Sequence, residues 1–204
     1  AGMPPGVSKR TYGIDSTHEQ PGTSHISIVD AQGNAVAMTT TIESAFGSRL
    51  MTHGFLLNNE LTDFSFNPAG DDGVPAANRV EGGKRPRSSM APLIVFDPDG
   101  RLYAVTGSPG GSRIILFMVK TLVALIDWDM DARESAALEN FGSEGGPLQL
   151  ETGASDFWIA LVLKTYGHQV VHVAMTSGVH TIVRRDGHLE GGADPRREGA
   201  ALGD

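Results

Sequence analysis

The strongest constraint on the fold comes from a pair of strand-like segments near the amino end of the chain. From Ser24 to Asp30 polar and apolar residues alternate, which is the period of a half-buried β-strand. The turn cluster Gln32-Gly33-Asn34 follows, and a second β-type run extends from Ala35 to Ile42. Two such runs around a short polar turn predict a β-hairpin.

This hairpin places a threonine beside other polar groups. Folding about Gln32-Gly33 brings Thr23, at one open end, beside Thr41, Ile42 and Glu43 at the other. A hydroxyl at the start of a strand is a simple layout for a threonine nucleophile, which its own α-amine can activate once the preceding peptide bond is cut. A free α-amine has a pKa of about 7.7–8.0, so it can accept the hydroxyl proton near neutral pH. Any such activity therefore requires cleavage of the peptide bond before this threonine.

Composition excludes several functional classes. At 204 residues, with 40% apolar and 20% charged residues, the chain is one globular domain or most of one. The net charge of −8 argues against nucleic-acid binding, which needs accumulated cations. The chain has no cysteine, which excludes disulfides and thiolate metal sites. We found no run of 18 apolar residues, so we expect no membrane span in this chain.

The rest of the pattern predicts a mixture of strands and helices. The expected strands are 55–59, 93–96, 102–106, 148–151, 170–173 and 181–185. The expected helices are 113–126, 131–140 with Asp131 as N-cap, and 155–166 ending at Gly167. Residues 65–83 are expected to form a long loop. Hairpins and helices in this order favour an α+β sandwich.

A glycine-rich turn separates one predicted strand from the helix that follows. Gly107-Ser108-Pro109-Gly110-Gly111-Ser112 lies where backbone N–H groups at a helix start can face an anion. From the residues alone a phosphate cradle, an oxyanion hole and a merely tight turn all stay open. The turn lacks the Lys-Ser/Thr pair of a P-loop and the spacing of a dinucleotide fingerprint. Their absence argues against a nucleotide-binding site.

The histidines and the basic run predict no site by themselves. His168 and His172 lie on a predicted strand, where a four-residue step is ~13 Å, too far for two ligands of one ion. The alternation places His25 on the same strand face as Thr23. The basic run Lys84-Arg85-Pro86-Arg87 is short and typical of a solvated loop.

A series of short motifs runs in order from Thr23 to about Arg196. They are Thr23-Ser24-His25, Val29-Asp30, Gly33-Asn34, Thr41, Leu56-Leu57-Asn58-Asn59, Asp63-Phe64, Lys84-Arg85-Pro86, Ser88-Ser89-Met90 and Thr106-Gly107-Ser108-Pro109-Gly110-Gly111-Ser112-Arg113. In order and spacing they resemble the small subunit of γ-glutamyltranspeptidase. The resemblance implies the four-layer αββα architecture of the N-terminal-nucleophile hydrolases.

The resemblance also implies a division of the chain and a partner. Residues 1–22 resemble the tail of a large subunit before a self-cleavage site at Gly22–Thr23, and residues 23–204 resemble the small catalytic subunit. The implied partners are the large subunit of the same precursor, in a heterodimer, and a small γ-glutamyl substrate such as glutathione, with no metal or cofactor. Members of the family lead us to expect a periplasmic or secreted location.

The resemblance assigns catalytic roles to four positions. Thr23 matches the nucleophile that attacks the γ-glutamyl carbonyl, and Thr41 matches the residue that orients its hydroxyl. Gly110 and Gly111 match the backbone donors of the oxyanion hole, where one donor typically supplies ~3–4 kcal/mol in the transition state.

Substrate-binding roles follow in the same way. Ser88 and Ser89 match the pair that holds the substrate α-carboxylate, and Glu60 and Asp63 match acceptors for its α-ammonium. Glu43 departs from the family, since well-studied members carry Asn there. Three carboxylates exceed what one ammonium neutralises, so we expect one to be protonated or turned away.

Two alternatives to a γ-glutamyl transferase and hydrolase stay open. One is an acylase on the same scaffold that hydrolyses a related amide, such as a glutaryl side chain. The other is a non-catalytic module in which the glycine-rich turn binds an anion and Thr23 is only a strand residue. Self-cleavage at Gly22–Thr23 is expected only of the enzymes.

Overall fold

The computed structural model describes residue 13, residues 22–153 and residues 156–203, and the chain divides into two compact units. The first unit comprises Ala1–Gly22 and Thr41–Ser88, and the second comprises Thr23–Thr40 and Ser89–Asp204. Apart from Gly13 and Gly22, the segment 1–22 that the sequence analysis assigns to a preceding subunit lies outside the described residues.

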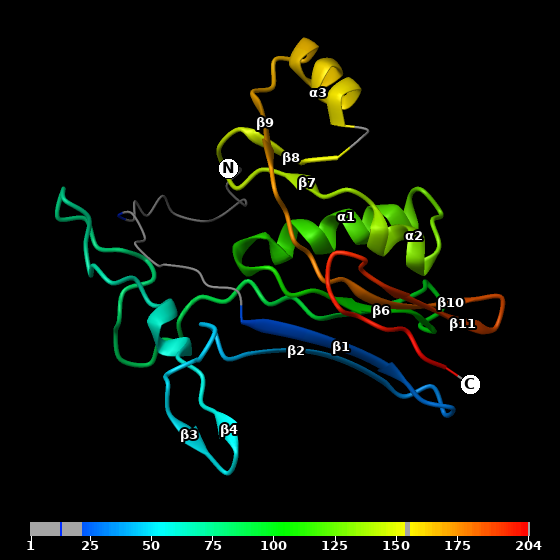
Figure 1. Cartoon of the computed structure of the whole chain (residues 1–204), viewed down its shortest axis with the longest axis horizontal. Helices are drawn as coiled ribbons and strands as arrows, with labels where there is room; N and C mark the ends of the chain where they lie inside the picture. The colour runs from blue at the N-terminus through cyan, green and yellow to red at the C-terminus, as the bar shows by residue number, and fades with distance from the viewer. Residues whose placement is uncertain (1–12, 14–21, 154–155, 204) are drawn as a thin grey trace. The chain divides into compact units, whose positions relative to one another are not determined.

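An antiparallel sheet of four strands forms the centre of the second unit (Figure 1). Its order is β11-β10-β6-β5, and its strands are β5 (Leu93–Phe96), β6 (Leu102–Gly107), β10 (His180–Arg185) and β11 (His188–Ala193). Asp97 closes the turn between β5 and β6, because its carboxylate accepts hydrogen bonds from the backbone N–H groups of Asp99 and Arg101. The three strands predicted in this region are confirmed, and the sequence analysis missed β11.

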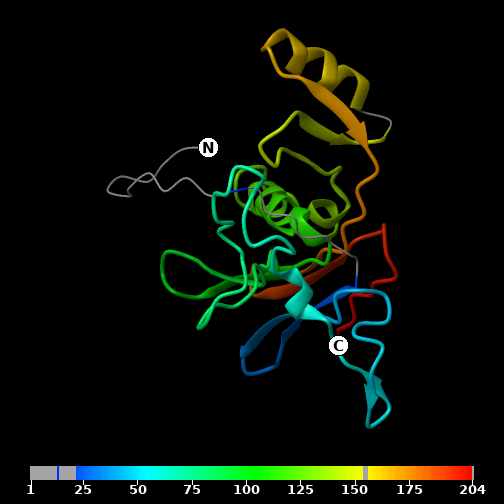
Figure 2. The ribbon, with the colours of Figure 1, turned by 90° about the vertical axis from the view of Figure 1, so that its left-hand side faces the viewer.

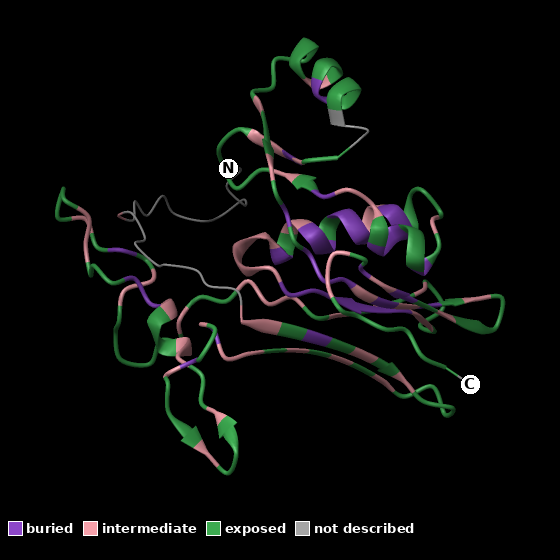
Figure 3. Cartoon of the chain, in the orientation of Figure 1, coloured by how far each residue is buried: buried purple, intermediate pink, exposed green. Residues whose placement is uncertain are grey.

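Two helices cover one face of this sheet (Figures 1 and 2). A short 3₁₀ turn, η2 (Gly111–Arg113), leads into α1 (Ile114–Ile126), and α2 (Ala132–Ala137) follows. The predicted N-cap of α2 is confirmed, since Asp131 and Glu134 form a reciprocal capping box. α2 ends at Ala137, earlier than predicted. Burial concentrates where α1 and the sheet face each other (Figure 3), and the buried apolar side chains there include Ile114, Phe117, Ala104 and Leu125.

The predicted first hairpin lies on the opposite face of the sheet, against β6 and β10 (Figures 1 and 2). It consists of β1 (Thr23–Val29) and β2 (Ala35–Thr41). The carboxylate of Asp30 accepts hydrogen bonds from the N–H groups of Gln32 and Asn34, and Gly33 adopts φ +83°. Helices, sheet and hairpin form successive layers of this unit, so the predicted α+β class is confirmed.

A three-stranded sheet with one helix completes the second unit. It has the order β7-β8-β9 and comprises β7 (Phe141–Gly142), β8 (Leu148–Glu151) and β9 (Val170–Val173). Strands β8 and β9 match the predicted bounds. Helix α3 (Asp156–Thr165) forms between them along the chain, which confirms the predicted helix, and its Phe157 and Trp158 side chains are 67% and 70% exposed.

The first unit is built from short elements and loops. A small hairpin, β3 (Met51–Thr52) and β4 (Phe55–Leu56), precedes a 3₁₀ turn, η1 (Glu60–Asp63). The predicted strand 55–59 stops at Leu56. The Asn58 side-chain carbonyl accepts from the backbone N–H of Glu60 in η1, and the Asn59 side-chain carbonyl accepts from the backbone N–H of Ser44 in the loop after β2. The predicted loop over residues 65–83 contains no named strand or helix.

A group of charged side chains, most of them buried or half-buried, joins the carboxyl-terminal segment to β8 and lies near Lys120 of α1. The Arg196 guanidinium bonds both carboxylate oxygens of Glu151 and one of Asp194. Lys120, on α1, is 1% exposed, and its ammonium donates to the carbonyl of Leu138 at 2.8 Å. The pKa of Lys120 is lowered from 10.5 to about 8, chiefly by burial and to a smaller extent by the Arg196 guanidinium.

None of the helices in the described residues combines the length and apolar character that a bilayer-spanning helix needs.

The lowered pKa of Lys120 predicts that the free energy of unfolding rises at alkaline pH. The unfolded chain keeps the proton of Lys120 up to about pH 10.5, whereas the folded chain releases it near pH 8, so stability rises with pH between these values. Relative to Lys120→Met, the wild-type free energy of unfolding should therefore increase by up to roughly 3 kcal/mol across this range. Urea unfolding at a series of pH values measures the difference. A constant difference between the two proteins would contradict the assignment.

Candidate active site

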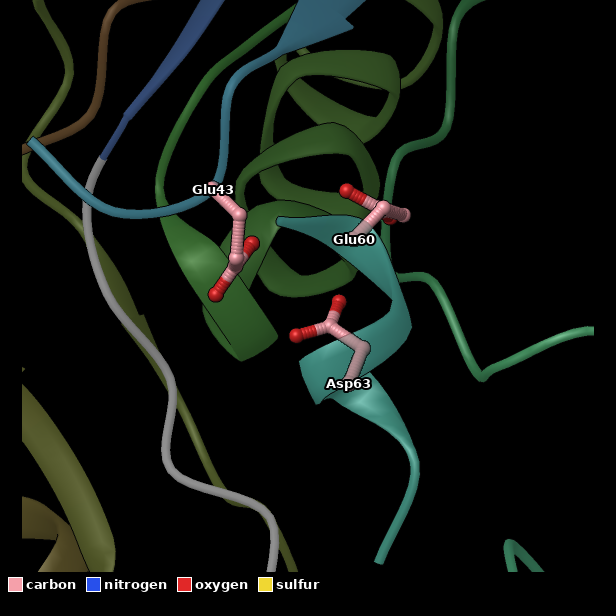
Figure 4. Close-up of side chains that lie close together, drawn as sticks. All are labelled: Glu43, Glu60 and Asp63. Carbon is pink, nitrogen blue, oxygen red and sulfur yellow. The ribbon is translucent and has the colours of Figure 1, made fainter. Parts of the chain in front are cut away.

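Three carboxylates gather in the first unit (Figure 4). Each of Glu43, Glu60 and Asp63 places a carboxylate oxygen within 4.8 Å of the other two. Glu60 and Asp63 are the first and last residues of η1, and a spacing of three residues puts their side chains on one face of a 3₁₀ turn. Glu43 reaches the same point from the loop after β2.

Local hydrogen bonds hold the loop that carries Glu43. The backbone N–H of Glu43 donates to the Thr41 hydroxyl at 2.9 Å, and the backbone N–H of Ser44 donates to the Asn59 side-chain carbonyl at 3.0 Å. Glu43 is 7% exposed and has φ +68°, a left-handed conformation that Asn adopts more readily than Glu. The loop therefore fixes a strained, buried carboxylate next to η1.

The electrostatics of the cluster favour binding of a cation. Burial, and then the neighbouring Asp63 carboxylate, raise the pKa of Glu60. One oxygen of Glu60, Oε2, is buried without a hydrogen-bond partner. An ammonium group or a divalent cation would relieve both the desolvation and the repulsion, because carboxylate oxygens are ligands for either.

A glycine turn in the second unit meets the start of α1. Gly110 and Gly111 have φ values of +144° and +62°, which disfavour other residues. A Cβ atom on Gly110 would lie 2.4 Å from the Phe117 ring. The Ser108 hydroxyl holds the turn from the other side, since it accepts a hydrogen bond from the backbone N–H of Gly178 at 3.0 Å. The backbone of this turn is thus held in a conformation that only glycine suits.

Thr23 is the first residue of β1 and is half-buried. Two residues further, the imidazole of His25 is 2% exposed and bonds the hydroxyls of Thr39, at 2.8 Å, and of Ser27, at 3.1 Å. The sequence analysis predicted that Thr23 and His25 share a strand face but not the hydrogen bonds of His25. The alternation in the sequence could have indicated these bonds, because the inward positions of β1 are polar while Ile26 and Ile28 face outward.

Several predicted neighbours fall on different units. Thr41 and Ser88 belong to the first unit, whereas Thr23 and Ser89 belong to the second. Ser88 is exposed and Ser89 half-buried, in a segment without regular secondary structure. The grouping of these residues with Thr23 stays a prediction. Within the described ranges, Glu43, Glu60 and Asp63 are the only group of three or more ligand-type side chains close enough to hold one ion, and this group includes neither His168 nor His172.

Comparison with known proteins identifies related chains. A family model described as Gamma-glutamyltranspeptidase matches residues 4–204. A curated relative, the "Glutathione hydrolase proenzyme" of Escherichia coli (strain K12), is 40% identical over 192 residues, which cover 88% of this chain and 32% of the relative. The protein of the same name from Bacillus subtilis (strain 168) is 36% identical over 190 residues, which cover 89% of this chain and 30% of that protein. This chain thus spans about a third of the length of these relatives.

Solved structures show the same fold. The Helicobacter pylori gamma-glutamyltranspeptidase T380A mutant is similar with a TM-score of 0.71 and 35% identity, covering 85% of this chain and 99% of that one. A cephalosporin acylase from Bacillus halodurans has a TM-score of 0.71 at 24% identity, covering 90% of this chain and 35% of that one, and shows the fold alone. The predicted N-terminal-nucleophile hydrolase fold is confirmed by these similarities.

The cluster predicts a stabilising substitution. Glu60→Gln removes one of the three carboxylates and should raise the free energy of unfolding at neutral pH by a few tenths to about 1 kcal/mol. The pKa of Glu60 is raised in the folded chain, so the folded state binds more protons than the unfolded state while this carboxyl titrates. Wild-type stability therefore falls as the pH rises through that range. The advantage of the variant should thus grow from pH 4 to pH 7. Urea unfolding at both pH values tests this, with Glu198→Gln, an exposed glutamate, as control.

Proposed function

Because the chain belongs to the γ-glutamyltranspeptidase family, we propose that it is the catalytic part of an enzyme that transfers or hydrolyses γ-glutamyl groups of glutathione-like amides. The observation that carries this proposal is the cluster of Glu43, Glu60 and Asp63. A γ-glutamyl donor has a free α-ammonium group, and the convergent carboxylates supply negative acceptors for that group even if one of the three is protonated. A glutaryl side chain has no such ammonium, so the cluster argues against the acylase alternative.

The proposed reaction begins with cleavage of the Gly22–Thr23 bond. Cleavage converts the Thr23 amide nitrogen into an α-amine that can act as a base. The amine takes the proton of the Thr23 hydroxyl, whose oxygen attacks the γ-carbonyl carbon of the donor and forms a tetrahedral oxyanion. Collapse of this intermediate breaks the amide bond, the leaving amine takes up the proton, and a γ-glutamyl ester on Thr23 remains.

Two groups of residues assist this chemistry in the proposal. The N–H groups of Gly110 and Gly111 donate to the oxyanion, a role that suits their glycine-only conformation. Ser88 and Ser89 hold the substrate α-carboxylate. An amino acid, a peptide or water then attacks the ester and frees Thr23 for another cycle.

The proposed partner is the preceding large subunit of the same precursor. The chain spans about a third of relatives that are named proenzymes, which supports a second, upstream polypeptide. Apolar side chains on α3 and on the outer face of the first hairpin are exposed in this chain. These exposed apolar side chains support the proposal of a second polypeptide that covers them.

The proposal predicts self-cleavage of the full-length precursor. The wild-type precursor should yield a fragment that begins at Thr23, and Thr23→Ala should stay uncleaved, because alanine has no hydroxyl to attack the preceding carbonyl. Mass spectrometry reads the fragments, and a chromogenic γ-glutamyl amide, compared with the matching glutaryl amide, reads the turnover. Release of glutamate from glutathione by an uncleaved Thr23→Ala precursor would overturn the proposal.

The proposal also predicts a double effect of Glu43→Asn. Asn suits the left-handed conformation at this position, so the free energy of unfolding should rise by about 0.5–1 kcal/mol. The loss of one carboxylate should also change the relative kcat/KM values for glutathione and other γ-glutamyl donors. Steady-state kinetics with several donors measures this change. Unchanged relative kcat/KM values would show that Glu43 does not select the donor.

A further inference from the structure

The inner face of β1 carries a directed chain of hydrogen bonds. The Ser27 hydroxyl donates to the backbone carbonyl of His180, on β10, at 3.1 Å. Its oxygen therefore accepts from Nε2–H of His25, and Nδ1 of His25 accepts from the Thr39 hydroxyl. In return, Nδ1–H of His180 donates to the backbone carbonyl of His25 at 2.7 Å. These bonds define one tautomer of a neutral His25 and join β1 to both β2 and β10.

The same imidazole lies directly on a glycine of the central sheet. A Cβ atom on Gly107, the last residue of β6, would lie 2.1 Å from Cε1 and 2.3 Å from Nδ1 of His25. No side chain therefore fits between the ring and the sheet at this point. Gly107 leads directly into the turn that contains Gly110 and Gly111.

We infer that His25 is a positioning residue that sets the separation between β1, which begins with Thr23, and the turn after β6. The imidazole fills the space between the two elements, and its hydrogen bonds prevent β1 from shifting along the sheet. This inference rests on the proposed function, in which Thr23 supplies the nucleophile and the turn supplies the oxyanion donors. An error of about 1 Å between two such groups costs of the order of a hundredfold in rate.

Burial excludes His25 from acid–base chemistry near neutral pH. Burial, and then the facing His180 imidazole, lower the pKa of His25 to about 4. The other side chains that bond the ring, from Ser27 and Thr39, carry no charge. The ring is thus neutral at the pH at which a terminal α-amine works, and its effect on rate should not vary with pH there.

Kinetics of the cleaved two-chain protein test this inference. His25→Leu keeps a comparable volume but makes no hydrogen bonds, so kcat for a chromogenic γ-glutamyl amide should fall at least tenfold while KM changes less than twofold. His25→Gln retains an N–H donor and should recover most of kcat. The loss should be the same from pH 6 to pH 9. His188→Leu, at an exposed histidine on β11, is the matched control and should leave kcat unchanged.

Two further variants test the contact of His25 by changing its partners Ser27 and Gly107. Ser27→Ala removes the bond to β10 and should lower kcat several-fold, and Gly107→Ala should lower it at least tenfold because it displaces the ring. These variants decide the matter if His25→Leu does not fold or does not self-cleave. Wild-type kcat in all the cleaved variants, a change confined to KM, or a shifted pH profile in His25→Leu would overturn the positioning role. A wild-type protein without γ-glutamyl turnover would instead overturn the proposed function.

Discussion

Side-chain hydrogen bonds join the first hairpin to the central sheet of the second unit. Among the described strands, the hairpin and this sheet share no backbone ladder. A buried polar group without a partner costs about 1–3 kcal/mol, so the inner face of β1 can be polar only if each group is satisfied. His25, Ser27 and Thr39 satisfy one another and the backbone of β10. Unlike apolar packing, such bonds specify direction, and they define where β1 lies on the sheet.

Glycine makes this close approach possible at two places in the second unit. At Gly107 the absence of a side chain admits the imidazole of His25, and at Gly110 it admits the ring of Phe117. Gly107 ends β6, and Gly110 lies in the short connection that leads from β6 to α1. The start of this connection is therefore held between the hairpin layer and the helix layer, and this explains its defined backbone.

Local patterns predicted much of the secondary structure. Strands β8 and β9 and the capping of α2 by Asp131 follow from residues near in sequence. The misses have physical causes. β11 lacks an apolar alternation because glycines occupy its second half, and the two-residue strands β3 and β7 are too short to show a period.

The sequence by itself determined the hairpin, the α+β class and the family, because alternation, turn residues and ordered motifs are local properties. It also identified Glu43, Glu60 and Asp63 as candidates through the resemblance. Only the tertiary structure decided that these three carboxylates meet within 4.8 Å and that His25 lies on Gly107. The approach of Glu43 to Glu60 and Asp63, and of His25 to Gly107, joins different segments of the chain. These distances depend on how loops and layers pack, which no local pattern encodes.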